Sequence, residues 1–174
     1  MDLNNLLKKC KKGDIVSQEL LYKTYKDSLF ALCLKYCGNR EQAQDILQES
    51  FLIIFTTLNT YKGTGSFEGW MKRIAINQAI TKFKEEIKFN ILVNEDKLGT
   101  VEIESSLMDE IPLDTILACV QELPSRYRLV FTMYELDDYS HADIAQLLSI
   151  SEGTSKSNLH RSKLILREKL YLWK

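Results

Sequence analysis

Apolar residues recur at helical spacing through most of the chain, with polar positions between them. In the first half, Leu21, Leu29 and Leu32 share one stripe of a helix that we expect from Asp14 to Cys37. The expected helices of this half cover about residues 15–37, 39–58 and 67–86. Their predicted caps are Asp14, Asn39 and Ser66. The glycine-containing segment 61–66 is predicted to be a loop.

The second half continues in the same pattern, with shorter helices. They are expected at residues 113–123, 125–136, 141–148 and 152–172. Ser125 is expected to cap the second of these helices, and Ser140 with Asp143 has the spacing of a capping box. Ser151 is expected to cap the last helix. His141 is interpreted as a surface residue at a helix start.

Composition supports an all-α fold and a division into two helical domains. The 174 residues include only 7 Gly and 2 Pro, too few turn residues for a β-sandwich or barrel. Residues 85–114 carry nine acids and two bases, and residues 151–174 carry six bases and two acids. We therefore predict modules at 1–87 and 112–174 joined by an acidic linker, 88–111.

Several classes of protein are excluded by what the sequence does not contain. The first residues lack the apolar core of a secretory signal, and no apolar run approaches the length of a membrane span. The cysteines Cys10, Cys33, Cys37 and Cys119 are therefore expected to be free thiols in the cytoplasm. No catalytic motif, metal-ligand set or cofactor motif is present, so we expect neither an enzyme nor a cofactor.

The segment from Ser140 to Arg161 has the pattern of a DNA-binding helix-turn-helix. A short helix is followed by a three-residue turn, and Gly153 and Thr154 then open a longer helix whose amino end can approach a phosphate. Donors that can read base edges and phosphates follow on its outer face. These candidate residues are Thr154, Lys156, Ser157, Asn158, His160, Arg161 and Lys163. A solvated basic face of an ordinary amphipathic helix is the alternative.

Two sets of motifs carry a resemblance to a known family. Residues 123–131, Asp143-Ile-Ala145 and Ile150–Ser157 resemble the carboxy-terminal domain of extracytoplasmic-function (ECF) sigma factors. Residues 45–51 and 67–77 resemble domain 2 of the same sigma-70 family. The resemblance implies a sigma domain 2 helical bundle and a sigma domain 4 helix-turn-helix. It implies a promoter-recognition subunit that binds core RNA polymerase, at the clamp coiled coil of the largest subunit and the flap region, and promoter DNA.

The resemblance also implies roles for particular residues. The helix-turn-helix donors would read the −35 element. The polymerase contacts would be Asp45, Gln48, Glu49 and Phe51. Residues that would hold the −10 element as single-stranded DNA are Gly63, Thr64, Gly65, Ser66, Phe67, Trp70, Lys72, Arg73, Asn77, Lys82 and Lys84. For Trp70, packing in the core is the favoured expectation, with base stacking as the alternative. An anti-sigma factor is a further partner that the resemblance leaves open.

Some positions depart from the family pattern. Ser155 stands where an apolar residue is usual, Ser162 where alanine is usual, and Asn158 where arginine is often found. The promoter sequence therefore does not transfer from relatives. The alternative function is a stand-alone helix-turn-helix regulator that acts without polymerase. An enzyme with an appended DNA-binding domain is a third class, for which no active-site residues are found.

Overall fold

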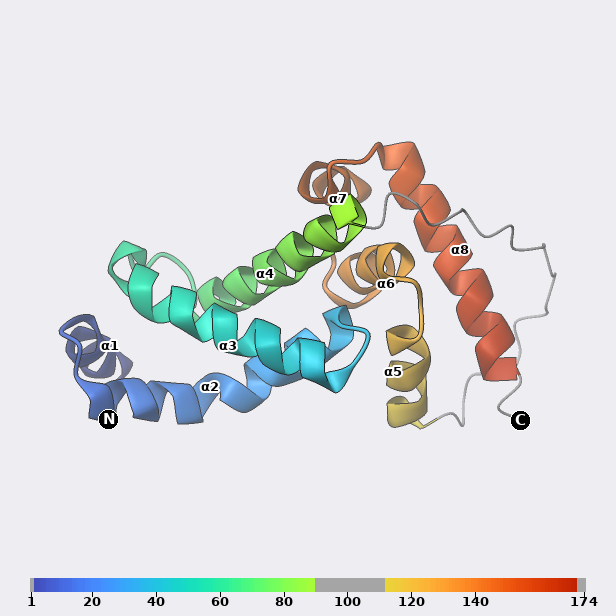
Figure 1. Ribbon diagram of the computed structural model, residues 1–174. Coiled ribbons are helices and arrows are strands. Elements are labelled where there is room, and N and C mark those ends of the chain that lie inside the picture. The colour runs from blue at the N-terminus through green and yellow to red at the C-terminus, as the bar shows by residue number, and fades with distance from the viewer. Residues whose placement is uncertain (1, 90–111, 172–174) are drawn as a thin grey trace. The chain divides into compact units, whose positions relative to one another are not determined.

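The computed structural model describes residues 2–89 and 112–171, and in these ranges the chain is helical with no strand (Figure 1). Contacts divide the chain into two compact units, Met1–Ala79 and Ile80–Lys174. The helices of the first part are α1 (Leu3–Lys11), α2 (Ile15–Tyr36), α3 (Arg40–Thr57), the 3-10 turn η1 (Leu58–Thr60) and α4 (Phe67–Phe89). The second part has α5 (Leu113–Gln121), α6 (Ser125–Phe131), the π-helical turn η2 (Thr132–Leu136), α7 (His141–Leu148) and α8 (Glu152–Tyr171).

Unit 1 is built on the long antiparallel pair α2 and α3, as the apolar stripes predict (Figure 1). Leu21, Leu29 and Ile54 are fully buried between the helices. The side chain of Asp14 accepts a hydrogen bond from the Ser17 amide at 2.9 Å, which confirms the predicted start of α2.

Helix α1 is an element that the sequence analysis missed. Its buried side chains, Leu6, Leu7 and Cys10, pack on α2 and on η1. The Asp2 side chain caps its start by accepting from the Asn4 amide. Its apolar residues Leu3, Leu6, Leu7 and Cys10 recur at intervals of three and four, so the helical pattern was present in the sequence and was overlooked.

In unit 2, helices α5, α6 and α7 pack against the long helix α8. One core cluster joins Cys119, Val120 and Leu123 to Leu166 of α8. The predicted capping box at the start of α7 is confirmed. Ser140 Oγ accepts from the Asp143 amide at 3.1 Å, while the Asp143 carboxylate accepts from the Ser140 amide at 3.2 Å.

The prediction that Ser125 caps α6 is wrong. Pro124 occupies the cap position, no side-chain cap bond is made, and Ser125 Oγ accepts instead from Arg128 at 3.2 Å. The predicted acidic linker lies outside the described residues, apart from Lys88 and Phe89 in α4. The division between the units falls within α4, at residues 79–80. No helix described in either unit has the length and apolar character needed to cross a lipid bilayer.

Candidate nucleic-acid and protein interfaces

The loop between η1 and α4 is held in a defined shape by its glycines and by Tyr61. Gly63 and Gly65 have φ of 79° and 81°, a conformation that other residues adopt only with strain. The Tyr61 hydroxyl donates to the Gly65 carbonyl at 2.9 Å. Ser66 Oγ accepts from the Gly69 amide at 3.0 Å, which confirms the predicted cap of α4. We name Tyr61, Gly63, Gly65, Phe67 and Trp70 the loop site.

Aromatic rings form the base of the loop site. The rings of Phe67 and Trp70 are stacked with centroids 5.6 Å apart, and Tyr61 lies 5.5 Å from Trp70. Phe67 is only 3% exposed, whereas Trp70 is half-buried. Phe67 is therefore a support for the loop, and Trp70 combines packing with an accessible edge. The sequence analysis treated Tyr61 only as a loop residue and missed its bracing role.

Helix α4 places three of the predicted residues on one face. Trp70, Arg73 and Asn77 follow at intervals of three and four, which aligns them along the helix. Arg73 and Asn77 are exposed. Lys72 instead makes an ion pair with Glu68 at 2.8 Å, and Glu68 also accepts from Ser28 at 2.9 Å. Lys72 is therefore already paired with an acid within the protein.

The other predicted residues of this set are placed as follows. Thr64 and Ser66 are exposed in the loop, and Lys82 and Lys84 are half-buried. The two lysines lie in the part of α4 that belongs to unit 2. The loop site, Arg73 and Asn77 therefore belong to unit 1, and Lys82 and Lys84 belong to unit 2.

A second surface lies on α3. Asp45 and Gln48 are exposed, Glu49 is half-buried, and Phe51 is 3% exposed with its ring 4.7 Å from Tyr22. Phe51 thus packs in the core, and its neighbour Leu52, 63% exposed, is the apolar residue that faces solvent. We name Asp45, Gln48, Glu49 and Leu52 the α3 surface.

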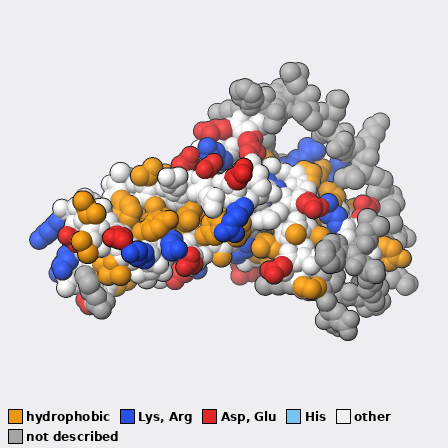
Figure 2. Space-filling model, turned by 60° about the horizontal axis from the view of Figure 1, so that its bottom comes forward, with side chains coloured by type: hydrophobic (Ala, Val, Ile, Leu, Met, Phe, Trp, Pro, Cys, Tyr) orange, Lys and Arg blue, Asp and Glu red, His pale blue; other side chains and the backbone are white. Residues whose placement is uncertain are grey.

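A groove of about 610 Å³ between α2 and α3 adjoins the α3 surface. Gln48, Phe51 and Leu52 line it from α3, and Tyr22 and Phe30 line it from α2. Figure 2 shows apolar side chains exposed along unit 1, with Lys and Arg side chains beside them. Lys26 and Arg40 also line the groove, whereas Asp45 and Glu49 are not among its lining residues, so the acidic charge that suits a basic partner lies on α3 beside the groove.

The third surface is the outer face of α8, which we name the α8 face: Thr154, Lys156, Ser157, Asn158, His160 and Arg161. Ser155, Leu159, Ser162 and Leu166 are buried on the opposite side. Ser151 Oγ accepts from the Thr154 amide at 3.0 Å, so the predicted cap is confirmed. Asn158 is half-buried, and Arg161 donates to the Tyr127 hydroxyl at 3.4 Å.

Lys163, also predicted to contact DNA, is engaged elsewhere. Its ammonium group pairs with Glu135 of η2 at 2.7 Å. The π-helical turn that presents Glu135 carries no signal that the sequence analysis recognised. Lys163 therefore serves at least partly to tie α8 to η2.

A polar pair inside the helix-turn-helix explains one departure from the family pattern. His141 Nδ1 lies 2.9 Å from Oγ of Ser155, which is fully buried, and the His141 ring stacks on Tyr134 at 4.4 Å. The buried Ser155 hydroxyl has a hydrogen-bond partner on α7, so a polar side chain is accommodated at this core position. His141 stands at the start of α7, as expected, but it is half-buried and joins α7 to α8.

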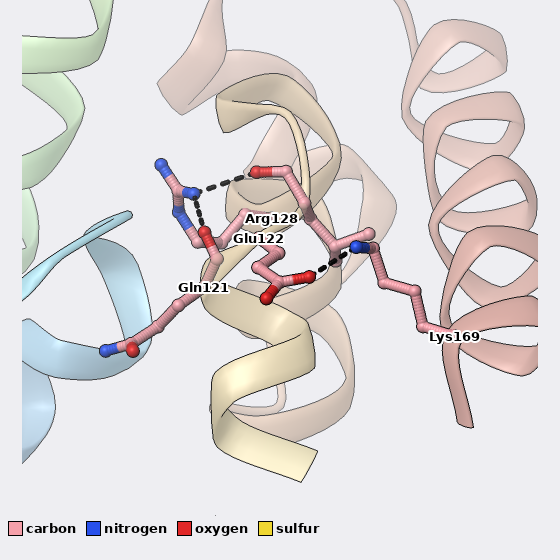
Figure 3. Close-up of polar contacts among 5 residues, drawn as sticks. Gln121, Glu122, Arg128 and Lys169 are labelled. Atoms are coloured by element: carbon pink, nitrogen blue, oxygen red, sulfur yellow. Dashed lines mark hydrogen bonds and ion pairs between the residues drawn. The ribbon is translucent and has the colours of Figure 1, made fainter. Parts of the chain in front are cut away.

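The buried guanidinium of Arg128 supports the α8 face from behind. Arg128 is 6% exposed and its Nη1 donates to the carbonyls of Gln121 and Leu123, at 2.7 and 2.8 Å. These carbonyls lie where α5 ends, so a positive charge also complements the helix dipole there. Nearby, Lys169 of α8 pairs with Glu122 (Figure 3). Together these contacts fix the corner between α5 and α6 against α8.

The cysteines of the protein are free and buried. Burial raises the pKa of the Cys33 thiol to about 12, with a further contribution from Cys37. Such thiols are poor nucleophiles at neutral pH.

Family models match both parts of the chain. The model of sigma-70 region 2 matches residues 21–87, and that of sigma-70 region 4 matches residues 113–166. The ECF RNA polymerase sigma factor SigW of Bacillus subtilis is 27% identical over 98% of this chain and 97% of its own length. The ECF sigma-E factor of Escherichia coli is 23% identical over 95% and 92%.

The fold is also found in a solved structure. The sigma factor RpoE, in its complex with the anti-sigma factor NepR from Bartonella quintana, aligns with a TM-score of 0.53 at 16% identity, covering 90% of this chain and 98% of RpoE. Two family models in the expected order, together with full-length similarity to curated sigma factors, show that the chain belongs to the sigma-70 family and is an RNA polymerase sigma factor of the ECF type.

Proposed function

We propose that this sigma factor binds core RNA polymerase through the α3 surface, holds the −10 element as a single strand at the loop site, and binds the −35 duplex with the α8 face. The observation that best supports this assignment is the braced loop. Two glycines with positive φ leave backbone without side chains in a loop that Tyr61 braces next to Trp70, and Arg73 and Asn77 follow on the same face of α4. An extruded base can enter there, stack, and pair with an amide.

Energetics explain why such a protein acts with the polymerase. Opening duplex DNA costs on the order of 1.4 kcal/mol for each base-pair step. Stacking one base on an aromatic side chain returns about 1–3 kcal/mol. Capturing one or two bases traps the first opened pairs, and polymerase contacts supply the remaining free energy. The net charge of −1 also points to a subunit, because an independent DNA-binding protein needs a stronger positive field.

The polymerase contact is proposed to be a basic helix of the clamp coiled coil. Asp45→Lys places a positive charge on the α3 surface and should weaken binding to core polymerase by about tenfold or more. Glu19→Lys is the matched control, since Glu19 is an exposed acid on α2 that pairs with Lys23 rather than with a partner protein. Equal affinity of the two variants would contradict the assignment of α3.

The two DNA contacts are separable by the stage at which they act. Arg161→Ala should cost about 1–3 kcal/mol in binding to the −35 element if the side chain reads a base. Asn77→Ala should slow open-complex formation while initial duplex binding is kept. If Asn77→Ala impaired initial duplex binding as much as open-complex formation, the result would count against capture of a base by Asn77.

A gel shift with and without core polymerase separates this function from that of a stand-alone regulator. The sigma role predicts a specific shift only when core polymerase is present. A specific shift by the protein alone at physiological salt, without transcription from added polymerase, would favour the regulator.

The domain organisation and one further partner belong to the same proposal. We assign the −10 and polymerase functions to residues 1–87 and the −35 function to residues 112–174, joined by the acidic segment 88–111. An anti-sigma factor is proposed as a regulator, by analogy with RpoE and NepR. Affinity purification from the source cell, with identification of a co-purifying inhibitor that displaces core polymerase, tests it.

A further inference from the structure

Helix α1 brings a group of lysines into unit 1 that the assigned functions do not use. Lys8, Lys9, Lys11 and Lys12 are all exposed, while Leu6, Leu7 and Cys10 hold the helix to α2 and η1. Figure 2 shows Lys and Arg side chains at the end of unit 1 that α1 occupies.

This helix lies directly beside the loop site. The Lys11 ammonium donates to the backbone carbonyl of Tyr61 at 3.5 Å, and Tyr61 is the residue whose hydroxyl braces Gly65. Lys62 is the next residue and is exposed. Lys11 therefore places the lysines of α1 next to Tyr61, at one edge of the loop site.

Helical geometry arranges three of these lysines in one row. Lys8 and Lys11 are three residues apart, and Lys8 and Lys12 are four apart, so their side chains project from one side of α1. The hydrogen bonds from Ser17 lower the pKa of the Asp14 carboxyl, with a smaller contribution from Lys9, which stands three residues before Lys12 at the edge of the same face.

Two lysines of the row, and Lys62 of the loop, also lack an acidic partner among the described residues. Among the described residues, Lys8, Lys12 and Lys62 make no ion pair, whereas Lys23, Lys72 and Lys163 are each paired with a glutamate. A row of unpaired ammonium groups next to a single-strand site is suited to the phosphates of the same strand, which attract them in a salt-dependent way.

We propose that Lys8, Lys11, Lys12 and Lys62 form a phosphate track that continues the loop site along the DNA strand. The track binds the backbone of the nucleotides that adjoin the captured base, and it carries no sequence preference of its own. This inference rests on the proposed −10 function of the loop site. Lys11 has a second role, because its contact with Tyr61 joins the track to the loop.

The test uses holoenzyme reconstituted with core polymerase and a forked promoter DNA whose −10 strand is already single. Lys8→Gln/Lys12→Gln removes two charges but keeps Lys11 and the loop geometry. Each phosphate contact contributes about 0.7 to the slope of log K against log salt, so the slope should fall by about 1.4 and affinity at 0.1 M salt by about 25-fold. Lys23→Gln/Lys35→Gln on α2 removes the same charge from the same unit and should leave the slope unchanged.

A second experiment varies the length of the single strand in the forked DNA. Shortening the single strand to the −10 element alone should abolish the difference between wild type and the Lys8/Lys12 variant. An unchanged salt slope in that variant, with normal binding by the wild type, would overturn the track but not the loop site. Wild-type holoenzyme that binds the forked DNA no better than duplex carrying only the −35 element would instead overturn the loop site.

Anionic phosphatidylglycerol vesicles give a third measurement. If the Lys8/Lys12 substitutions weaken sedimentation of the protein with these vesicles while the DNA salt slope is unchanged, the lysines face a lipid surface and the track is refuted. The track predicts no vesicle binding above that of the Lys23/Lys35 control.

Discussion

Replacement of Arg128 by alanine is expected to loosen unit 2 at the corner that supports the α8 face. The substitution removes two hydrogen bonds to the carbonyls of Gln121 and Leu123 and one to Ser125 Oγ. A hydrogen bond from a charged donor contributes about 1.5–3 kcal/mol, and a buried carbonyl left without a donor costs about 1–3 kcal/mol. The desolvation of the buried guanidinium offsets part of this gain. We therefore expect a loss of about 3 kcal/mol in the free energy of unfolding of unit 2.

Hydrogen exchange followed by mass spectrometry measures this loss locally. The slowest amides of α6 and α8 should exchange roughly 100-fold faster in the Arg128 variant, because about 1.4 kcal/mol corresponds to a factor of ten. Amides of α2 and α3 should be unaffected. Arg167→Ala, at an exposed position of α8, is the control and should change unit 2 by less than about 0.5 kcal/mol. If Arg128→Ala and Arg167→Ala gave the same exchange rates, the guanidinium would not be holding the end of α5.

Three other predictions follow from single features. Gly65→Ala should cost about 1 kcal/mol through its positive φ, since no neighbour lies within 4 Å of a Cβ there, and should weaken binding to forked DNA but not to core polymerase; an unchanged DNA affinity would show that the loop shape is unimportant. Ser140→Ala should destabilise unit 2 by about 1 kcal/mol in urea unfolding, and Asp143→Ala on top of it should add less than its single effect, because both belong to one capping box. The raised pKa of Cys33 means that the unfolded chain releases this thiol proton at lower pH than the folded chain. Stability should therefore be constant up to about pH 9 and decline as pH rises towards 12, and a Cys33→Ala variant that declined as steeply would refute the assignment.

The sequence predicted best what is encoded by short local patterns. The caps at Asp14, Ser66, Ser140 and Ser151 each place a side-chain oxygen before a run of helix formers, and each forms the expected bond. The buried stripe of α2 follows from helical period alone. These signals need no knowledge of what the helix packs against.

Features that depend on tertiary contacts were missed. The π-helical turn η2 positions Glu135 for Lys163 without a recognisable local signal, whereas helix α1 was overlooked although its apolar spacing is helical. The bond between His141 and Ser155 spans fourteen residues and could be suspected only from a serine at an expected core position. Periodicity does not report such pairings, because each partner looks like an ordinary surface residue.

The candidate surfaces also combine features that local sequence indicates with features that only the folded chain decides. Residue types in the loop site and the α8 face were identified from the sequence, but burial changed the roles of some of them. Phe51 and Phe67 are in the core, while Leu52 and Tyr61 take the exposed and bracing roles. Lys72 and Lys163 are paired with glutamates that only the folded chain brings near them.

Promoter-directed transcription tests the central claim most directly. Purified core polymerase supplied with this protein should initiate from a single class of promoters in a mixed library, at a fixed distance downstream of paired −35 and −10 elements. The Asn77 and Arg161 variants should each lose that class. If core polymerase initiated without regard to promoters, and adding the protein changed nothing although its unit 2 bound DNA tightly, the result would contradict the account.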